Sequence, residues 1–314
     1  IDIGIMQRIN LTVEVYSKKS TDLLSNEKIN PTLGNGPTYI NAASIQNKGI
    51  ELNLQADWIA KPGFNWNTGI IFAANNSKTL KVFQNKAFYP QALNSAGYLE
   101  GYPLAPLFAY RYAGIDDTGM PMVQGEKGEV YKTSLSNISS IMNNRSLGIT
   151  YYKGTSIPRF NAGFSNRIDI GNLYVFTMIN YYGGFKVLAP RPSPGDSRPL
   201  EGAGTYWKQP GDERTSDVIS LAAFASAMSR LAYDYADVSV VNGDYITLGD
   251  VTVSYNFAKY PMLKRLGFSL FELKAQASNV YTVGLNRFNY SKATGSFAKR
   301  YITPTYTIAL FTNF

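Results

Sequence analysis

Carboxylates are the side chains of this 314-residue chain that could carry acid–base or metal chemistry, because the chain contains neither His nor Cys. Asp116 and Asp117 precede Gly119, a pattern that could form a calcium loop or a carboxylate pair. The longer ligand run of a dedicated calcium loop is absent, so the pattern favours a solvated turn. Two further acidic pairs are interpreted as loop-surface charges: Asp212 with Glu213, and Glu126 with Glu129. Imidazole- and thiolate-based catalysis and metal binding are excluded. We therefore expect no enzyme, no metal site and no cofactor.

Aromatic side chains are the other group that could act on a ligand, because their flat faces can stack on sugar rings. The chain has 23 Tyr, 17 Phe and 3 Trp. The candidates for substrate binding in loops are Tyr39, Tyr98, Tyr110, Tyr112, Tyr206 and Trp207. The alternative is that these rings only pack the loops together. A peptide would instead use polar loop groups and exposed backbone, and the sequence does not discriminate between the two cargoes.

The net charge of +8 raises the question of nucleic-acid binding. Lys and Arg are scattered along the chain and form no basic run with interleaved aromatic residues. Contact with membrane phosphates, or ordinary charged rims, accounts for the charge equally well. We therefore expect a lipid membrane as a partner and no nucleic acid.

Strict alternation of apolar and polar residues predicts the elements that must position these groups. In segment 50–58, apolar residues oppose Glu51, Asn53, Gln55 and Asp57. In a barrel these four residues are expected to line a wet lumen, whereas in a soluble sandwich they would meet bulk water, and the alternation alone does not separate the two. The final segment, 304–314, alternates in the same way and ends on Phe314. About ten residues is the length that a tilted strand needs to cross a bilayer. The residues expected to face lipid are Leu52, Leu54, Trp58, Phe72, Ile308 and Leu310.

Eight crossing strands are predicted, with short turns on one side and long connections on the other. The strands are expected at 8–16, 50–58, 64–74, 160–168, 173–182, 245–257, 268–280 and 304–314. The short turns are 59–63, 169–172 and 258–267, and the long connections are 17–48, 76–159, 183–244 and 281–303. This asymmetry is typical of an outer-membrane β-barrel, with the turns periplasmic and the loops extracellular. Successive strands must run in alternating directions across the membrane. Segment 107–114 would break this alternation, so we expect it to fold within a loop and not to cross the membrane.

Three local features accompany this layout. The apolar phase slips at Gly249-Asp250, which predicts a β-bulge. Segment 216–233, opened by residues 215–217 as cap, predicts a helix within a loop. Segment 190–195 is expected to be a stiff, proline-rich loop. No signal peptide is evident and the first residue is Ile1, so we expect the C-terminal part of a longer protein.

Several motifs, in order and in strand context, resemble the SusC-like (SusC/RagA-type) branch of TonB-dependent transporters. The similarity is greatest in residues 243–257, GDYITLGDVTVSYNF. The other motifs are 47–54 (NKGIELNL), 64–66 (FNW), 74–78 (ANNSK), 100–104 (EGYPL), 113–116 (AGID), 154–158 (GTSIP) and 277–282 (ASNVYT). Together they extend over essentially the whole chain.

This resemblance implies an all-β fold, in which residues 1–314 form about the last eight strands of a 22-stranded transmembrane antiparallel barrel with long extracellular loops. The plug domain and TonB box would lie upstream. The implied function is import of oligosaccharides or oligopeptides, driven by TonB and assisted by a SusD-like surface lipoprotein, in the outer membrane of a Gram-negative, Bacteroidetes-like bacterium. Phe314 would be the signal read by the barrel-assembly machinery. Two alternatives stay open: a barrel of this family that acts as a structural or assembly subunit, and a secreted soluble β-sandwich binding module.

Overall fold

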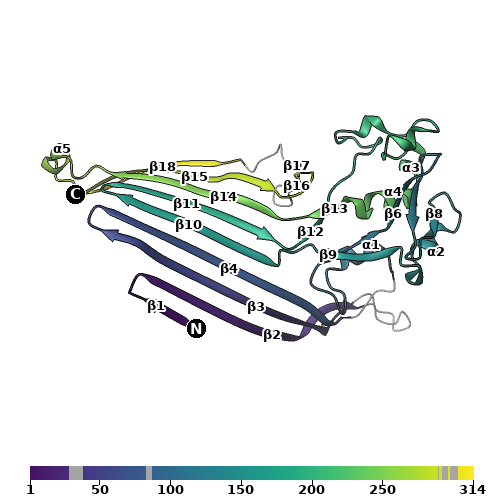
Figure 1. Cartoon of the computed structure of the whole chain (residues 1–314), viewed down its shortest axis with the longest axis horizontal. Helices are drawn as coiled ribbons and strands as arrows, with labels where there is room; N and C mark the ends of the chain where they lie inside the picture. Colours follow the sequence, from purple (N-terminus) through teal and green to yellow (C-terminus); the bar gives the residue numbers. More distant parts are fainter. Residues whose placement is uncertain (28–37, 83–86, 289, 292–295, 298–302) are drawn as a thin grey trace.

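In the computed structural model, the chain folds into one long antiparallel sheet with a body of loops at one end (Figure 1). The structure describes the whole chain except residues 28–37, 83–86, 289, 292–295 and 298–302. The nine strands of the sheet follow the order β1-β2-β3-β4-β10-β11-β14-β15-β18, so each strand lies beside the next crossing strand of the chain. Their bounds are β1 Asp2–Ile5, β2 Ile9–Glu27, β3 Thr38–Lys61, β4 Phe64–Lys81, β10 Phe160–Ile170, β11 Leu173–Gly183, β14 Tyr245–Asn256, β15 Leu270–Gly284 and β18 Thr305–Asn313.

All eight predicted crossing strands are present, and a short strand, β1, pairs with the outer edge of β2. The prediction of a long connection at 17–48 is wrong, because β2 and β3 remain paired as far as Glu27 and Thr38. Residues 17–22 are all polar, so this part of β2 shows no alternation of apolar and polar residues from which a strand could be predicted. The turn at 258–267 contains a short helix, α5 (Pro261–Arg265).

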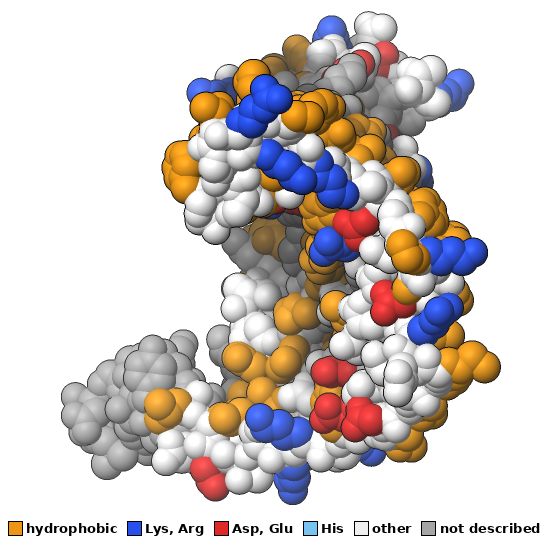
Figure 2. All heavy atoms as spheres, turned by 90° about the vertical axis from the view of Figure 1, so that its left-hand side faces the viewer, with side chains coloured by type: hydrophobic (Ala, Val, Ile, Leu, Met, Phe, Trp, Pro, Cys, Tyr) orange, Lys and Arg blue, Asp and Glu red, His pale blue; other side chains and the backbone are white. Residues whose placement is uncertain are grey.

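The register of the sheet separates an apolar face from a polar face. Leu52 of β3 lies opposite Phe72 of β4, and Leu310 of β18 lies opposite Leu273 of β15. We call the side that carries these residues the apolar face. Many of its large side chains are exposed, including Val15, Ile50, Trp58, Trp66, Phe164, Ile179, Val253, Ile308 and Leu310. Viewed along the strands, the molecule is an open arc with hydrophobic side chains along its convex edge (Figure 2).

The predicted bulge lies at Gly249, where the pairing of β14 shifts against both neighbouring strands. On one side of the bulge Ile246 and Leu248 lie on the apolar face, and on the other side Val251 and Val253 do. The bulge therefore absorbs the extra residue and keeps these four apolar side chains on the same face, although the sequence changes phase.

The long connections form a second region, which we call the loop body (residues 87–159 and 185–244). Its strands are β5 (Pro106–Tyr110), β6 (Tyr112–Ile115), β7 (Pro121–Gln124), β8 (Val130–Lys132), β9 (Thr150–Thr155), β12 (Lys186–Leu188) and β13 (Val240–Asn242). Its helices are α1 (Pro90–Ala96), α2 (Ile138–Met142), α3 (Leu221–Ala225) and α4 (Ala227–Asp234), with 3-10 turns at Arg145–Leu147, Ala203–Thr205, Asp212–Arg214 and Asp237–Ser239. As predicted, segment 107–114 does not cross, because β5 pairs with β9 inside this body. A small hairpin of β16 (Tyr290–Ser291) and β17 (Ser296–Phe297) lies in the last connection.

The loop body has a hydrophobic core of its own. Tyr110, Val123 and Met142 are buried together with Ala232 of the other long connection. A second cluster joins Ile115 to Ile219, Ala223 and Tyr233. The two long connections are therefore packed against each other and form one structured unit.

The helix predicted at 216–233 is wrong in its start and its continuity. Two helices occupy this segment, and their caps are Ser220 and Ser226, whose hydroxyls accept hydrogen bonds from the amides of Ala223 and Ser229. The extended backbone of Ser226, with ψ of 120°, ends α3 and begins α4 at one residue. No helix in the described part of the chain is long and apolar enough to cross a membrane.

Candidate functional site

The polar face of the sheet carries the four residues expected to line a lumen. Glu51, Asn53, Gln55 and Asp57 all lie on this face, opposite to Leu52 and Leu54, and all four are exposed. Asp57 Oδ1 accepts a hydrogen bond of 2.8 Å from Asn67 Nδ2 on β4. The register thus brings the four together as predicted. Their contact with a lumen or with cargo stays a prediction.

A second polar group on this face was not identified from the sequence as a functional group. Asp250 accepts hydrogen bonds from Thr252 Oγ1 at 2.6 Å, from Ser278 Oγ at 3.3 Å and from the side-chain amide of Gln276. Glu272, on the same face of β15, accepts from Ser254 Oγ. The predicted bulge at Gly249 could have indicated this group, because a bulge changes the direction of a neighbouring side chain, here that of Asp250.

The loop aromatics predicted to bind substrate do not form one site. Tyr110 is 1% exposed and belongs to the core of the loop body, so no sugar ring can stack on it. Tyr98 is 50% exposed, whereas Tyr206 and Trp207 are half-buried. The side chain of Tyr39 lies outside the described residues.

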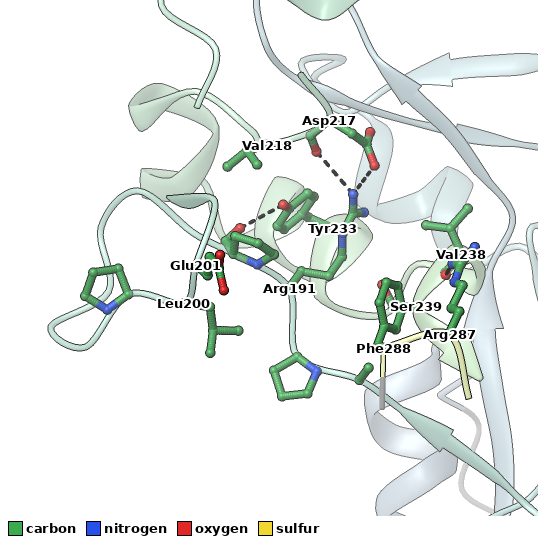
Figure 3. Close-up of a pocket in the computed structure, with 14 residues that line it drawn as sticks. Arg191, Leu200, Glu201, Asp217, Val218, Tyr233, Val238, Ser239, Arg287 and Phe288 are labelled. Atoms are coloured by element: carbon green, nitrogen blue, oxygen red, sulfur yellow. Dashed lines mark hydrogen bonds and ion pairs between the residues drawn. The ribbon is translucent and has the colours of Figure 1, made fainter. Parts of the chain in front are cut away.

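A cavity of about 920 Å³ lies between the proline-rich segment of the loop body, the helices of that body and residues 287–288 of the last connection (Figure 3). Arg191 points toward Asp217 across it, with Leu200 and Glu201 on one side and Arg287 and Phe288 on the other. Most of its lining is apolar, from Pro190, Pro192, Pro199, Leu200, Val218, Val238 and Phe288.

Arg191 is the central polar residue of this cavity. Its guanidinium carbon lies 3.8 Å from the ring centroid of Tyr233 and 4.6 Å from that of Tyr112. It forms an ion pair with Asp217, which also accepts a 2.7 Å hydrogen bond from the Tyr112 hydroxyl. Burial raises the pKa of Tyr233 to about 12 and raises that of Tyr112 further, so both phenols stay protonated.

The sequence showed only a stiff proline-rich loop at 190–195 and did not single out Arg191. An Arg set between Pro190 and Pro192 was the available signal. Tyr112, a candidate for stacking on a sugar, packs on this guanidinium, in keeping with the alternative that the loop aromatics pack the loops together.

Asp116 forms a turn, as favoured over a calcium loop, but the turn is not solvated at this residue. Asp116 is 5% exposed, and its Oδ1 accepts hydrogen bonds from Thr118 N, Thr118 Oγ1 and Met120 N at 2.9, 2.6 and 3.0 Å. Lys132 Nζ lies 3.3 Å from its other oxygen. Burial alone would raise the pKa of Asp116, but these hydrogen bonds outweigh it and lower the pKa.

The remaining acidic candidates lie on the loop surface, as predicted. Glu126 and Glu129 are exposed. Asp212 accepts a 2.9 Å hydrogen bond from the Lys208 amide, and Glu213 accepts one of 2.8 Å from the Gly211 amide. The described residues contain no group of three or more acidic side chains placed to hold a metal ion.

Comparison with known proteins gives one curated relative and several similar folds. TonB-dependent receptor P39 of Formosa agariphila is 23% identical over 333 aligned positions, which cover 90% of this chain and 31% of the relative. Structures of the RagAB peptide transporter and of the RagAB peptide importer in its 'closed-closed' state give TM-scores of 0.67 and 0.69 at 17% identity. They are matched over 89% and 96% of this chain, and over 30% and 33% of theirs. No family model matches.

The chain thus spans about a third of the length of the proteins it matches. Its long antiparallel strands, its exposed apolar face and its loop body at one end are those expected for a segment of an outer-membrane β-barrel. The relative and the similar folds confirm the resemblance read from the motifs: this chain is similar to part of a SusC-like TonB-dependent outer-membrane transporter.

Proposed function

We propose that residues 1–314 form the C-terminal portion of the barrel of a TonB-dependent importer in the outer membrane of a Gram-negative, Bacteroidetes-like bacterium. The observation that carries this proposal is the pairing of an exposed apolar face with a polar face on one curved sheet. Such a wall separates lipid from a wet channel. The plug and the TonB box of the parent protein would precede the first strand.

The asymmetry of the connections supports an orientation. Two of the turns at one end of the sheet contain only two residues, 62–63 and 171–172, whereas the loop body occupies the other end (Figure 1). Short turns are periplasmic in outer-membrane barrels and long loops are extracellular. The loop body would therefore face the surroundings of the cell, and Phe314 would lie near the periplasm, where the barrel-assembly machinery acts.

For the cargo, the loop body favours peptides over oligosaccharides. Tyr110 is buried and Tyr112 is covered by Arg191, so these rings are withdrawn from sugar stacking. The loop cavity offers an apolar lining, which suits peptide side chains. The RagAB proteins of similar fold are peptide transporters, which points the same way.

Uptake by cells that carry the full-length parent tests this assignment. Labelled oligopeptides should be accumulated in a TonB-dependent manner, and Leu200→Asp in the cavity should lower uptake. Leu135→Asp, at an exposed leucine outside the cavity, is the matched control and should leave uptake unchanged. Uptake of oligosaccharides alone would contradict the peptide assignment. If the variants affect abundance of other membrane proteins but no cargo enters, the alternative of an assembly subunit holds.

A SusD-like lipoprotein is the partner proposed for the loop body. The body is broad and internally packed, which suits a docking platform. Shortening residues 190–235 to a tight turn in the parent should abolish co-purification of the lipoprotein in detergent while the barrel still folds. Unchanged co-purification would place the docking surface on loops upstream of this chain.

The alternative of a soluble β-sandwich is overturned by the sheet arrangement. The other described sheets have two or three strands, and none of them covers the apolar face of the large sheet. A sandwich needs a second sheet packed there.

A further inference from the structure

The short-turn end of the sheet carries an apolar groove beside α5. It measures about 690 Å³ and is lined by Phe257, Tyr260, Met262, Leu263, Leu273 and Leu310, together with Phe271. Leu273 and Leu310 belong to the apolar face, so the groove continues that face to the end of the strands. It opens on the side that faces lipid in a membrane-spanning sheet.

The groove is built by aromatic packing. The ring of Phe257 lies 6.0 Å from that of Tyr260 and 6.4 Å from that of Phe271, between centroids. Phe268 then links Phe271 to Phe314, at 5.3 and 4.3 Å. Against this wall, Met262 is 69% exposed and Tyr260 is 51% exposed, so large apolar surface remains open. An exposed apolar patch on a folded surface indicates a binding partner.

Three cations without counter-charges lie on α5 or just before it, next in sequence to residues that line the groove. Lys259, Lys264 and Arg265 are exposed, and none of them forms an ion pair with any residue that the structure describes. Segment 257–271 contains no Asp or Glu. Figure 2 looks onto this end and shows Lys and Arg side chains beside hydrophobic ones in its upper part, where α5 lies.

We propose that this groove binds an anionic phospholipid of the leaflet at the short-turn end. One acyl chain lies against Phe257, Leu263 and Leu273, and Lys259, Lys264 and Arg265 receive the headgroup phosphate. The apolar lining and its position at the membrane boundary favour a lipid chain, and unpaired cations favour a negative headgroup. Tyr260 lies between the two regions, as aromatic residues do at membrane interfaces. This inference needs membrane insertion but not import of any cargo.

Native mass spectrometry of the full-length parent in detergent tests the site, with phosphatidylglycerol and phosphatidylethanolamine as probes. Phosphatidylglycerol should be retained preferentially. The triple variant Lys259→Gln, Lys264→Gln and Arg265→Gln should lose this preference, by about fivefold for each cation removed. Lys61→Gln, an exposed cation at the end of β3, is the matched control and should retain it. Equal retention by the triple variant would overturn the proposal.

A phospholipid with a photoactivatable acyl chain tests the apolar half independently. The crosslink should map to Met262 or Leu263, and Leu263→Gln should reduce it. A crosslink spread evenly over the apolar face would show general solvation by lipid and would overturn the site. Co-purification of a protein on this groove, in place of lipid, would do the same. Both assays measure lipid binding to the folded, heat-resistant barrel. A parent protein that fails to import cargo would therefore still give a valid result for this site.

Discussion

The sheet and the loop body of this chain differ in where they place their large apolar side chains: the sheet exposes them and the loop body buries them. In the sheet, large apolar residues such as Ile308 and Leu310 are 79% and 56% exposed, and polar residues such as Gln55 lie on the opposite face. In the loop body, Phe108, Tyr110 and Met142 are about 1% exposed. The loop body is organised for water outside and the sheet for lipid outside. The two regions of this chain are therefore built for different surroundings, and in β2 the boundary lies at segment 17–22, where the strand leaves the apolar layer.

The largest effect should come from breaking the core of the loop body. Phe108 is 1% exposed and packs edge-on against Tyr102 and Tyr152 at 5.2 and 5.7 Å. Phe108→Ala should cost about 3–5 kcal/mol within this body. Limited proteolysis should then cut the loops while the barrel keeps its heat-resistant mobility on gels. Tyr98→Ala, at a half-exposed ring, should leave the loops resistant.

A charge on the apolar face should give the next largest effect. Leu54→Arg should cost roughly 2–4 kcal/mol near the middle of the bilayer and lower the folded fraction in membranes. Gln55→Arg, one residue along on the polar face, should be tolerated, because alternate residues of a strand point to opposite sides. Equal folded fractions of the two variants would contradict the assignment of one face to lipid and the other to water.

The buried carboxylate of the loop body should show a pH-dependent effect. Because folding lowers the pKa of Asp116, its charge stabilises the body above the pKa of an unfolded Asp, about 3.9. This contribution is lost as the pH falls from there through the lower folded pKa. Asp116→Asn should therefore cost about 1.5–3 kcal/mol at neutral pH. The difference should shrink in acid, as measured by hydrogen exchange of 116–120 in the parent and the variant. A constant difference down to pH 2 would contradict this account.

The smallest effect on stability should come from the end of the last strand. Phe314 is 78% exposed, and its ring packs against that of Phe268 in a tilted arrangement with 4.3 Å between centroids, a pair worth about 0.5–1.5 kcal/mol. If Phe314 is an assembly signal, Phe314→Ala should lower the abundance of the parent in the membrane far more than Phe268→Ala. Equal losses would show that the ring pair itself matters. Unchanged abundance with altered uptake would make Phe314 a transport residue.

The contrast also explains which parts could be predicted from the sequence. Strands between lipid and water must alternate, so 50–58 and 304–314 were evident, as were their two faces. The extension of β2 to Glu27 was missed, because beyond the apolar layer both sides of a strand are wet. The loop body uses strands of three to six residues, too short to carry a period. Aromatic residues serve both cores and binding surfaces, so the burial of Tyr110 and the role of Arg191 needed the packed structure.

The bulge at Gly249 corrects the reading frame of β14: it absorbs the one residue by which the apolar pattern of the sequence changes phase. Deletion of Gly249 would make Leu248 and Asp250 neighbours, and because these two residues already lie on opposite faces, β14 would pair with β11 in a regular ladder and keep Ile246, Leu248, Val251 and Val253 on the apolar face. Insertion of one residue elsewhere in the strand, with no second bulge to absorb it, would instead turn one half of β14 over and move its apolar side chains to the polar face. A point substitution in this strand changes one side chain, whereas an unabsorbed change of length reverses a whole half-strand. In such a wall, the number of residues between two turns decides which face each side chain reaches, as much as the chemistry of those residues decides which face suits them.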